Sequence, residues 1–384
     1  MQMHDILDRL VAFDTVSHRT NLPLLHVVRD LLAGEGIAVE LIPDATGTKA
    51  NLLALTGPRD VPGILLSGHV DVVPVEGQAW TRPPFRLTAE GGRLYGRGTT
   101  DMKGFVACAI AAMLDAARRP LRAPLILALS HDEEVGCRGV GSLIDRMPAF
   151  AARPRLVLVG EPTGLRACIG HKGKVALRAD CTGRAMHSSC APLTVNAIHL
   201  AVDMVGAIRD LQAGIAATGP FDADYEVPYT TLHAGRIRGG VQVNVVADSA
   251  TVDFEIRSLA QDDPAARIAD LAARAEAIAA RYRPLAPEAA ITLTRDWDYP
   301  GLSTPPDDPA VALVQRLSGD NRPPFKVPFG TEGGLFAARL GLPTVVCGPG
   351  HMAQGHTPDE FIEAAELARC QAMLARLTDG LEAA

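Results

Sequence analysis

The sequence lacks the features that mark membrane-spanning, secreted and nucleic-acid-binding proteins. Its longest apolar run, residues 106–114, is too short to cross a bilayer, and its first five residues show no basic segment followed by an apolar one. No dense stripe of Lys and Arg offsets the formal net charge of −7, which argues against a nucleic-acid partner. The seven cysteines form no Cys-x-x-Cys pair, as expected for free thiols in a reducing compartment. These absences predict a cytoplasmic protein that binds neither membranes nor nucleic acid.

The chain has 384 residues, of which 47% are hydrophobic, so we expect about two domains with sizeable cores. Short apolar runs alternate with helical patterns through the first 170 residues. The runs at 51–55, 63–66, 124–129 and 155–159 are typical of buried strands, and helical patterns cover 21–32, 103–117 and 139–147. Strands separated by helices need crossover connections, which predicts an α/β fold with a mainly parallel sheet flanked by helices.

The pattern changes after residue 170. Strand-like alternation covers 174–181, 230–237 and 249–257, and helical patterns cover 194–211 and 264–283. This order is typical of a small α+β sandwich. The α/β pattern then resumes, with helices at 309–317 and 361–377 and a strand at 344–347. We therefore expect an inserted domain of residues 172–287 within a larger domain of residues 1–171 and 288–384.

His69 ends an apolar run and is followed two positions later by Asp71. Ligands bind at the carboxyl ends of strands in open α/β sheets. An imidazole there can hold a metal ion while a nearby carboxylate fixes its tautomer. A lone histidine in such a position is more often structural, so this segment alone leaves both interpretations open.

Residues 95–104 form a glycine-rich segment that contains Asp101. The segment lacks the Gly-Lys-Ser/Thr of a P-loop and the third glycine of a dinucleotide-binding fingerprint. Asp101 has two interpretations of about equal weight at this point. It either caps the helix that follows, where the helix dipole favours an acid, or bridges two cations with its two carboxylate oxygens.

Three consecutive acids, Asp132, Glu133 and Glu134, follow the apolar run at 124–129. Like charges at the mouth of a buried strand are costly, because desolvation raises carboxylate pKa values. A solvated loop would remove this cost, and so would a cation. With a cation, one carboxylate can bind the ion while its neighbour accepts a proton from water.

Two later segments place further ligand types after apolar strands. Glu161 follows the run at 155–159, and the loop after 344–347 carries His351 and His356. Five strands of one sheet are thus expected to end in potential ligands, namely His69, Asp101, Glu134, Glu161 and His356. With Asp101 as the bridge, each of two ions would receive one imidazole, one terminal carboxylate and a shared oxygen, which leaves room for a water. Nitrogen and oxygen ligands without thiolate suit zinc, cobalt or manganese.

These motifs together resemble the M20 metallopeptidase and deacylase family over nearly the whole chain. The likeness is carried, in order, by residues 67–74, 96–104, 133–134, 160–163, 330–336 and 347–350. Within the family they are most similar to the acetylornithine deacetylase branch, which fits a Glu at position 161 better than the desuccinylase branch does. The resemblance implies hydrolysis of N-acyl amino acids, with N2-acetyl-L-ornithine favoured as substrate, and two divalent ions, zinc or cobalt. Alternatives with the same chemistry are an N-acetylcitrulline deacetylase, a succinyl-diaminopimelate desuccinylase, an aminoacylase or a dipeptidase; a catalytically dead metal-binding scaffold is the alternative from another class.

The resemblance also implies a role for each ligand. One ion would be held by His69, Asp101 and Glu161, and the other by Asp101, Glu134 and His356. His356 is preferred to His351 because residues 355–360 match the family's last ligand motif. Asp71 would orient His69, and Glu133 would act as the general base.

For the inserted domain, the resemblance implies a lid that also mediates homodimerisation. His187, in a segment similar to the family's lid motif, would reach across the dimer to hydrogen-bond the substrate carbonyl oxygen. Asn244 and Arg257 would hold the substrate carboxylate, although Arg257 could instead pair with an exposed acid. Thr331 is a further candidate for contact with substrate. Glu332 either attracts a cationic side chain or is a buried structural acid.

Overall fold

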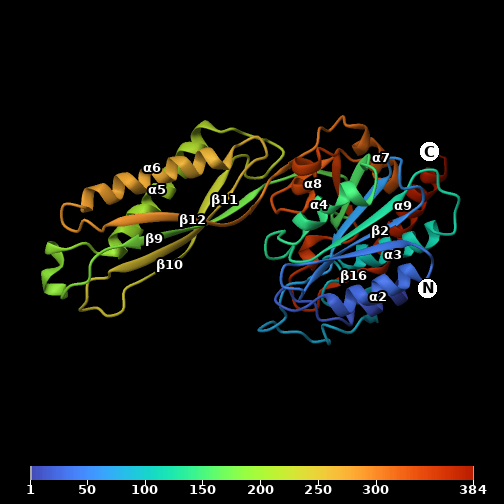
Figure 1. Cartoon of the computed structure of the whole chain (residues 1–384), viewed down its shortest axis with the longest axis horizontal. Coiled ribbons are helices and arrows are strands. Elements are labelled where there is room, and N and C mark those ends of the chain that lie inside the picture. The colour runs from blue at the N-terminus through green and yellow to red at the C-terminus, as the bar shows by residue number, and fades with distance from the viewer. Residues whose placement is uncertain (1, 384) are drawn as a thin grey trace. The chain divides into compact units, whose positions relative to one another are not determined.

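The computed structural model describes residues 2–383, which form two compact units (Figure 1). The first unit consists of the chain up to Gly170, Leu302–Lys326 and the chain from Thr331 onward. The second consists of His171–Gly301 and Val327–Gly330. Among the helices formed by residues 2–383, none combines the length and apolar character needed to span a membrane.

A large mixed sheet organises the first unit. Its strands, in spatial order, are β1 (Ala38–Pro43), β2 (Ala50–Thr56), β6 (Leu125–Ser130), β3 (Ile64–His69), β7 (Leu156–Pro162), β15 (Thr344–Gly348), β8 (Cys168–His171) and β13 (Leu302–Ser303), with β14 (Phe325–Val327) paired to β8. The central strands β6, β3, β7 and β15 run parallel and are buried along their length, whereas β1, β2 and β8 pair antiparallel with their neighbours. Burial on both faces explains their continuous apolar runs. The predicted α/β class, with a mainly parallel central sheet flanked by helices, is confirmed.

Helices cover both faces of this sheet (Figure 1). One layer contains α1 (Met3–Val11), α2 (Leu22–Ala33), α3 (Lys103–Ala116), α7 (Pro309–Ser318) and α9 (Ala364–Ala383), and the other contains α4 (Val140–Phe150) and α8 (Gly333–Leu340). The first helix layer packs tightly on β7 at Gly160, where an added Cβ would lie 2.0 Å from the ring of Phe105. The glycine before Glu161 thus lets α3 approach the carboxyl end of β7.

A small antiparallel sheet of β16 (Phe361–Glu363), β5 (Arg93–Tyr95) and β4 (Thr88–Glu90) corrects two predictions. The predicted helix at 361–377 begins with strand β16, which pairs with β5, and α9 starts only at Ala364. The strand that precedes Asp101 is β5, so it does not belong to the large sheet. The Tyr95 and Phe361 rings, 5.5 Å apart, join these short strands through side-chain packing.

The second unit is an antiparallel sheet with one helical layer. The sheet order is β10 (Thr231–Gly239), β11 (Ser249–Arg257), β9 (Lys174–Thr182) and β12 (Ala290–Tyr299), and α5 (Ala197–Thr218) and α6 (Pro264–Tyr282) lie side by side across one face (Figure 1). β12 lies beyond the boundary predicted at residue 288. It belongs to this unit because it pairs with β9 from Ala290 opposite Thr182 to Tyr299 opposite Lys174.

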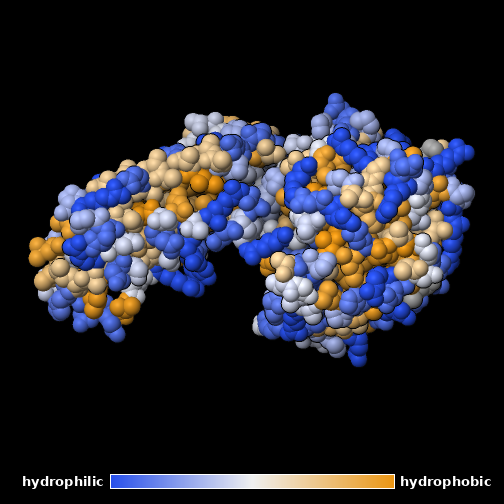
Figure 2. All heavy atoms as spheres, viewed as in Figure 1, coloured by the Kyte–Doolittle hydropathy of each residue, from blue (hydrophilic) through white to orange (hydrophobic). Residues whose placement is uncertain are grey.

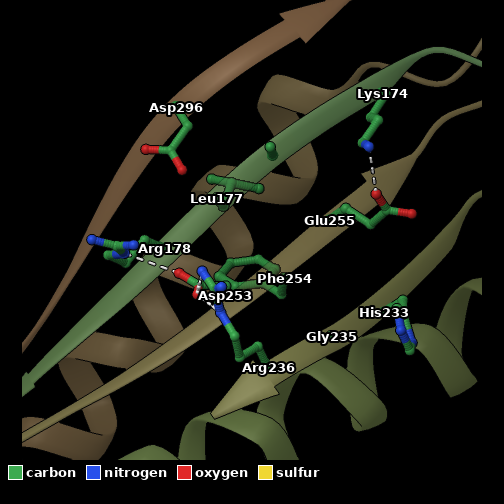
Figure 3. A pocket seen from close by; sticks show the side chains of 11 residues that line it. Lys174, Leu177, Arg178, His233, Gly235, Arg236, Asp253, Phe254, Glu255 and Asp296 are labelled. Carbon is green, nitrogen blue, oxygen red and sulfur yellow. Dashed lines mark hydrogen bonds and ion pairs between the residues drawn. The ribbon is translucent and has the colours of Figure 1, made fainter. Parts of the chain in front are cut away.

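The face of this sheet that the helices leave open carries alternating charges (Figure 3). Lys174 pairs with Glu255 at 3.0 Å, and Asp253 pairs with Arg178 at 2.9 Å and with Arg236 at 2.5 Å, around a cavity of about 350 Å³. Partly exposed ion pairs of this kind contribute little to stability. The strand alternation therefore gives one apolar face against the helices and one polar face.

Candidate metal centre

The first unit brings the five predicted metal ligands into one cluster, in which the carboxylates and His69 are largely buried and His356 is partly exposed. They come from the end of β3, the turn before α3, the loop after β6, strand β7 and the loop after β15; these ligands are His69, Asp101, Glu134, Glu161 and His356. The expectation that each ligand ends a strand of one sheet is wrong for Asp101. That residue lies in the turn before α3, and α3 packs against β3, β6 and β7.

Asp101 lies between two imidazoles. Its Oδ1 is 3.1 Å from Nε2 of His69, and its Oδ2 is 3.0 Å from Nε2 of His356. Helix α3 has Met102 as its N-cap and no side-chain capping hydrogen bond, so the capping interpretation of Asp101 is wrong. Each carboxylate oxygen faces a separate nitrogen ligand, which is the arrangement expected of a carboxylate shared by two cations.

Each imidazole also has its own terminal carboxylate. Oε1 of Glu161 lies 3.7 Å from Nε2 of His69, and Oε2 of Glu134 lies 3.0 Å from Nε2 of His356. Ligand atoms of His69, Asp101 and Glu134 all lie within 4.8 Å of one another, as do those of His69, Glu133 and Glu161. The described residues therefore offer two overlapping groups of nitrogen and oxygen ligands.

The electrostatics of this cluster fit two divalent ions. Burial, together with neighbouring acids such as Asp101, raises the pKa of Glu133 and Glu161 well above their usual range and that of Glu134 to about 7. Burial acts in the same sense on Asp101, but hydrogen bonds from His356 and His69 outweigh it and lower its pKa. Several acids share one desolvated space, and cations would stabilise them all in the ionised form.

His69 is held in the tautomer that a metal ligand requires. Its Nδ1 donates to the backbone carbonyl of Asp71 at 2.9 Å, so in the neutral ring Nε2, which faces Asp101, carries the lone pair that binds a metal ion. The Asp71 carboxylate, predicted to orient His69, is farther away, at 3.6 Å from Nδ1. It accepts instead from the backbone N–H groups of Glu133 (3.1 Å) and Glu134 (3.3 Å) and from the hydroxyl of Ser17 (2.7 Å). Asp71 thus connects the His69 strand end to the turn that carries both glutamates.

The three consecutive acids divide between two environments. Asp132, in the left-handed region at φ 58°, turns away from the cluster and pairs with Lys49 at 2.5 Å and His131 at 3.1 Å. Glu133 and Glu134 face the buried ligands, and the Cys137 thiol donates to Oε1 of Glu133 at 3.4 Å. The solvated-loop alternative therefore fails for both glutamates.

Residues outside the predicted set also support the cluster. Arg97 and Glu360, each 1% exposed, form a buried ion pair at 2.7 Å, and Glu360 accepts from the backbone N–H of Asp101. The sequence does contain a clue to these two residues, because both lie in segments that carry family motifs. Each is a charged residue in apolar or glycine-rich surroundings, which indicates a buried charge.

Three further candidates in the first unit have structural contacts. Thr331 is fully buried, and its hydroxyl accepts from the N–H of Gly333 at the start of α8, so its substrate role stays a prediction. Glu332 is 1% exposed, and burial raises its pKa to about 7, which favours the structural interpretation over attraction of a cationic side chain. His351 is exposed and packs against Gly164 beside the turn that follows Glu161.

Three of the predicted substrate-contacting residues lie in the second unit. His187 is exposed and precedes the short 3-10 helix η1 (Ser188–Leu193). Its Nδ1 accepts from the N–H of Ser189 at 3.2 Å, so in the neutral ring the proton is on Nε2. Asn244 is exposed, and its backbone carbonyl accepts from the N–H of Ser188. Arg257 donates to Glu255 at 2.9 Å and to the Tyr299 hydroxyl at 3.0 Å.

Comparisons with known proteins agree with this arrangement. Residues 65–379 match the family described as peptidase family M20/M25/M40. An acetylornithine deacetylase from Salmonella paratyphi B is 34% identical over 366 residues, which cover 94% of this chain and 92% of that protein. A tripeptidase from Staphylococcus aureus has a similar fold, with a TM-score of 0.77 at 18% identity over 100% of this chain and 98% of that chain. A dinuclear metal-binding M20 peptidase from Bacillus subtilis has a TM-score of 0.70 at 15% identity, over 99% of this chain and 98% of that one.

Proposed function

The chain belongs to peptidase family M20/M25/M40, whose members hydrolyse amide bonds, and we propose that it removes the acyl group of an N-acyl amino acid. N2-acetyl-L-ornithine is the proposed substrate, and the reaction would release ornithine and acetate for arginine biosynthesis. The 34% identity to an acetylornithine deacetylase supports this choice of substrate. The observation that carries the chemistry is Asp101, whose two carboxylate oxygens face His69 and His356.

We assign one ion to His69, Asp101 and Glu161 and the other to Asp101, Glu134 and His356, with zinc or cobalt as the proposed metals. Ions held there would lower the pKa of a bound water and polarise the scissile carbonyl. Glu133 would accept the proton of the attacking water and deliver it to the leaving nitrogen. The backbone N–H of Glu133 donates to the Asp71 carboxylate, and this hydrogen bond holds the backbone of the proposed base beside His69.

The oxyanion would be stabilised by His187 from a second copy of the chain. The hydrogen bond to Ser189 puts the proton of the neutral ring on the exposed Nε2, which is the donor that this role needs. Asn244 and Arg257 are proposed to hold the substrate carboxylate. Arg257 would have to exchange its contact with Glu255 for that role.

A homodimer through the second unit is supported by its exposed apolar surface. β10 is an edge strand of the sheet, and Ile237 on it is 50% exposed. Val202 on the neighbouring helix α5 is 56% exposed, and Figure 2 shows hydrophobic side chains over the helical layer of this unit. An exposed edge strand is a template for pairing with another strand, and exposed apolar side chains mark surfaces that bind other proteins. We propose that two copies pair there.

A reducing compartment, the cytoplasm, is the proposed location. All seven cysteines are free within residues 2–383, and each except Cys190 is buried. Buried free thiols suit a compartment in which disulfides do not persist.

The first test is a parallel hydrolysis assay on acetylornithine, acetylcitrulline, succinyl-diaminopimelate and plain N-acetyl amino acids. A clear preference for acetylornithine is expected, and a preference for another compound would reassign the substrate within the same chemistry. Absence of turnover on the whole panel by a metal-loaded protein would favour the scaffold alternative.

The second test replaces the proposed base. Glu133→Gln should lower kcat roughly 10²- to 10⁴-fold with bound metal unchanged. Glu226→Gln, at an exposed glutamate outside the site, is the matched control. Substantial activity in Glu133→Gln would contradict the role of Glu133.

The third test asks whether His187 is supplied across the dimer. His187→Ala and Glu133→Gln subunits are mixed in equal amounts and allowed to exchange. If each site uses His187 of the other subunit, about a quarter of all sites become intact in the mixture. A mixture that is no more active than the two variants assayed separately and added together would contradict a site shared between subunits.

A further inference from the structure

We propose that Arg97, Glu360 and Gln78 form a positioning network that holds Asp101 and His356 as one unit of the metal centre. The inference rests on the proposed two-ion function. None of the three side chains touches the reacting atoms, so each would act through the backbone of a ligand.

The first arm of the network holds the backbone of Asp101. Oε1 of Glu360 accepts from the N–H of Thr100 at 2.9 Å and from the N–H of Asp101 at 3.1 Å. Oε2 of the same carboxylate accepts from Nη1 of Arg97 at 2.7 Å. Because every contact uses a charged partner, each is stronger than a hydrogen bond between neutral groups.

The second arm holds the loop that carries His356. Nη2 of Arg97 donates to Oε1 of Gln78, and Nε2 of Gln78 donates to the backbone carbonyl of His356 at 3.1 Å. Nη1 of Arg97 also lies 3.4 Å from the carbonyl oxygen of Thr357. The Arg97 guanidinium, 4.9 Å above the ring of Trp80, is thereby fixed between the two arms.

The energetics favour positioning over stability as the reason for this pair. Removing an ion pair from water costs several kcal/mol per ion, so a buried pair adds little net stability. Replacing the outer partners that orient metal ligands typically lowers metal affinity by about 10- to 100-fold. Two imidazoles within 3.1 Å of one carboxylate leave little tolerance for movement of the backbone that carries it.

The two arms predict different metal-binding defects. Gln78→Leu removes the second arm, namely the contact to the His356 carbonyl and the contacts that Gln78 Oε1 accepts from Arg97 and Trp80, and leaves the Glu360 contacts to Thr100 and Asp101 in place. One of two Co²⁺ ions should therefore bind about 10- to 100-fold more weakly while the other keeps its affinity. Glu360→Gln disturbs the shared carboxylate, so both ions should bind more weakly. Gln315→Leu is the matched control, because its amide also donates to a backbone carbonyl, that of Arg322, but on α7 and outside the site.

Metal-free protein is titrated with Co²⁺ and followed by visible absorption and calorimetry, and the thermal midpoint of each metal-free variant is measured in parallel. An unchanged midpoint for metal-free Gln78→Leu, together with the loss of affinity for one ion, separates positioning from a structural role. Wild-type affinity for both ions in Gln78→Leu overturns the network, even if Glu360→Gln fails to fold. A wild-type protein that binds no pair of ions would instead overturn the proposed function on which the inference rests.

Discussion

His171 predicts a pH dependence of folding that can be measured in the second unit. The imidazole is fully buried at the end of β8, and its Nδ1 donates to the carbonyl of Lys172 at 3.0 Å. Burial lowers its pKa from 6.5 to about 4. The unfolded chain therefore binds a proton between pH 6.5 and 4 that the folded chain does not, so stability is lost as the pH falls through this range.

The magnitude follows from the two pKa values. Each pKa unit of difference corresponds to 1.36 kcal/mol. Relative to neutral pH, His171 should therefore lower the free energy of unfolding by about 2 kcal/mol at pH 5 and by about 3 kcal/mol below pH 4. The assay is urea unfolding between pH 7 and 5. In a Trp80→Phe background, fluorescence from Trp297 reports the second unit.

His171→Asn removes the titrating group while its amide can still donate to a backbone carbonyl. Between pH 7 and 5, the free energy of unfolding of this variant should fall by about 2 kcal/mol less than that of the parent, whatever the stability of the variant at neutral pH. His199→Asn, at an exposed histidine of α5, is the matched control and should keep the parental slope. An unchanged slope in His171→Asn would refute the reasoning, because the buried imidazole would then not control the proton uptake.

Three other predictions test the packing, the thiols and the metal centre. Gly160→Ala should lower the free energy of unfolding by about 1–3 kcal/mol or more in a urea titration, because its Cβ would overlap the Phe105 ring. Gly206→Ala is the control: nothing lies within 4 Å of its added Cβ, so it should be neutral or stabilising. A thiol reagent should modify Cys190 first in the native protein and all seven cysteines only after unfolding; rapid modification of several native thiols would contradict their burial. Removal of bound Zn²⁺ by a chelator should lower the thermal midpoint, and the decrease should grow with the logarithm of the ratio of the initial metal concentration to Kd. An unchanged midpoint would show that the ions do not favour the folded state.

Much of the site was visible in the order of residue types along the chain. His69 and Glu161 each lie at the carboxyl end of a buried apolar strand, and parallel strands bring their carboxyl ends to one edge. The sequence by itself therefore predicted an α/β unit with a metal centre at that edge. It also placed the helices and strands of the second unit through their periodicity, except for β12, whose mixed pattern was missed.

Only the tertiary structure decided between the interpretations that the sequence left open. Asp101 could cap α3 or bridge cations, and its contacts with His69 and His356 exclude capping. Glu332 could face a substrate or lie in the interior, and it is buried.

The backbone partners of the ligands were likewise beyond the sequence. Asp71 holds the turn of Glu133 with its carboxylate and His69 with its backbone carbonyl, and Glu360 reaches Asp101 from 259 positions away. Residue types and spacing determine which element a side chain belongs to, because propensity and periodicity are local. Which carboxylate meets which imidazole depends on packing between distant segments, which no local pattern records.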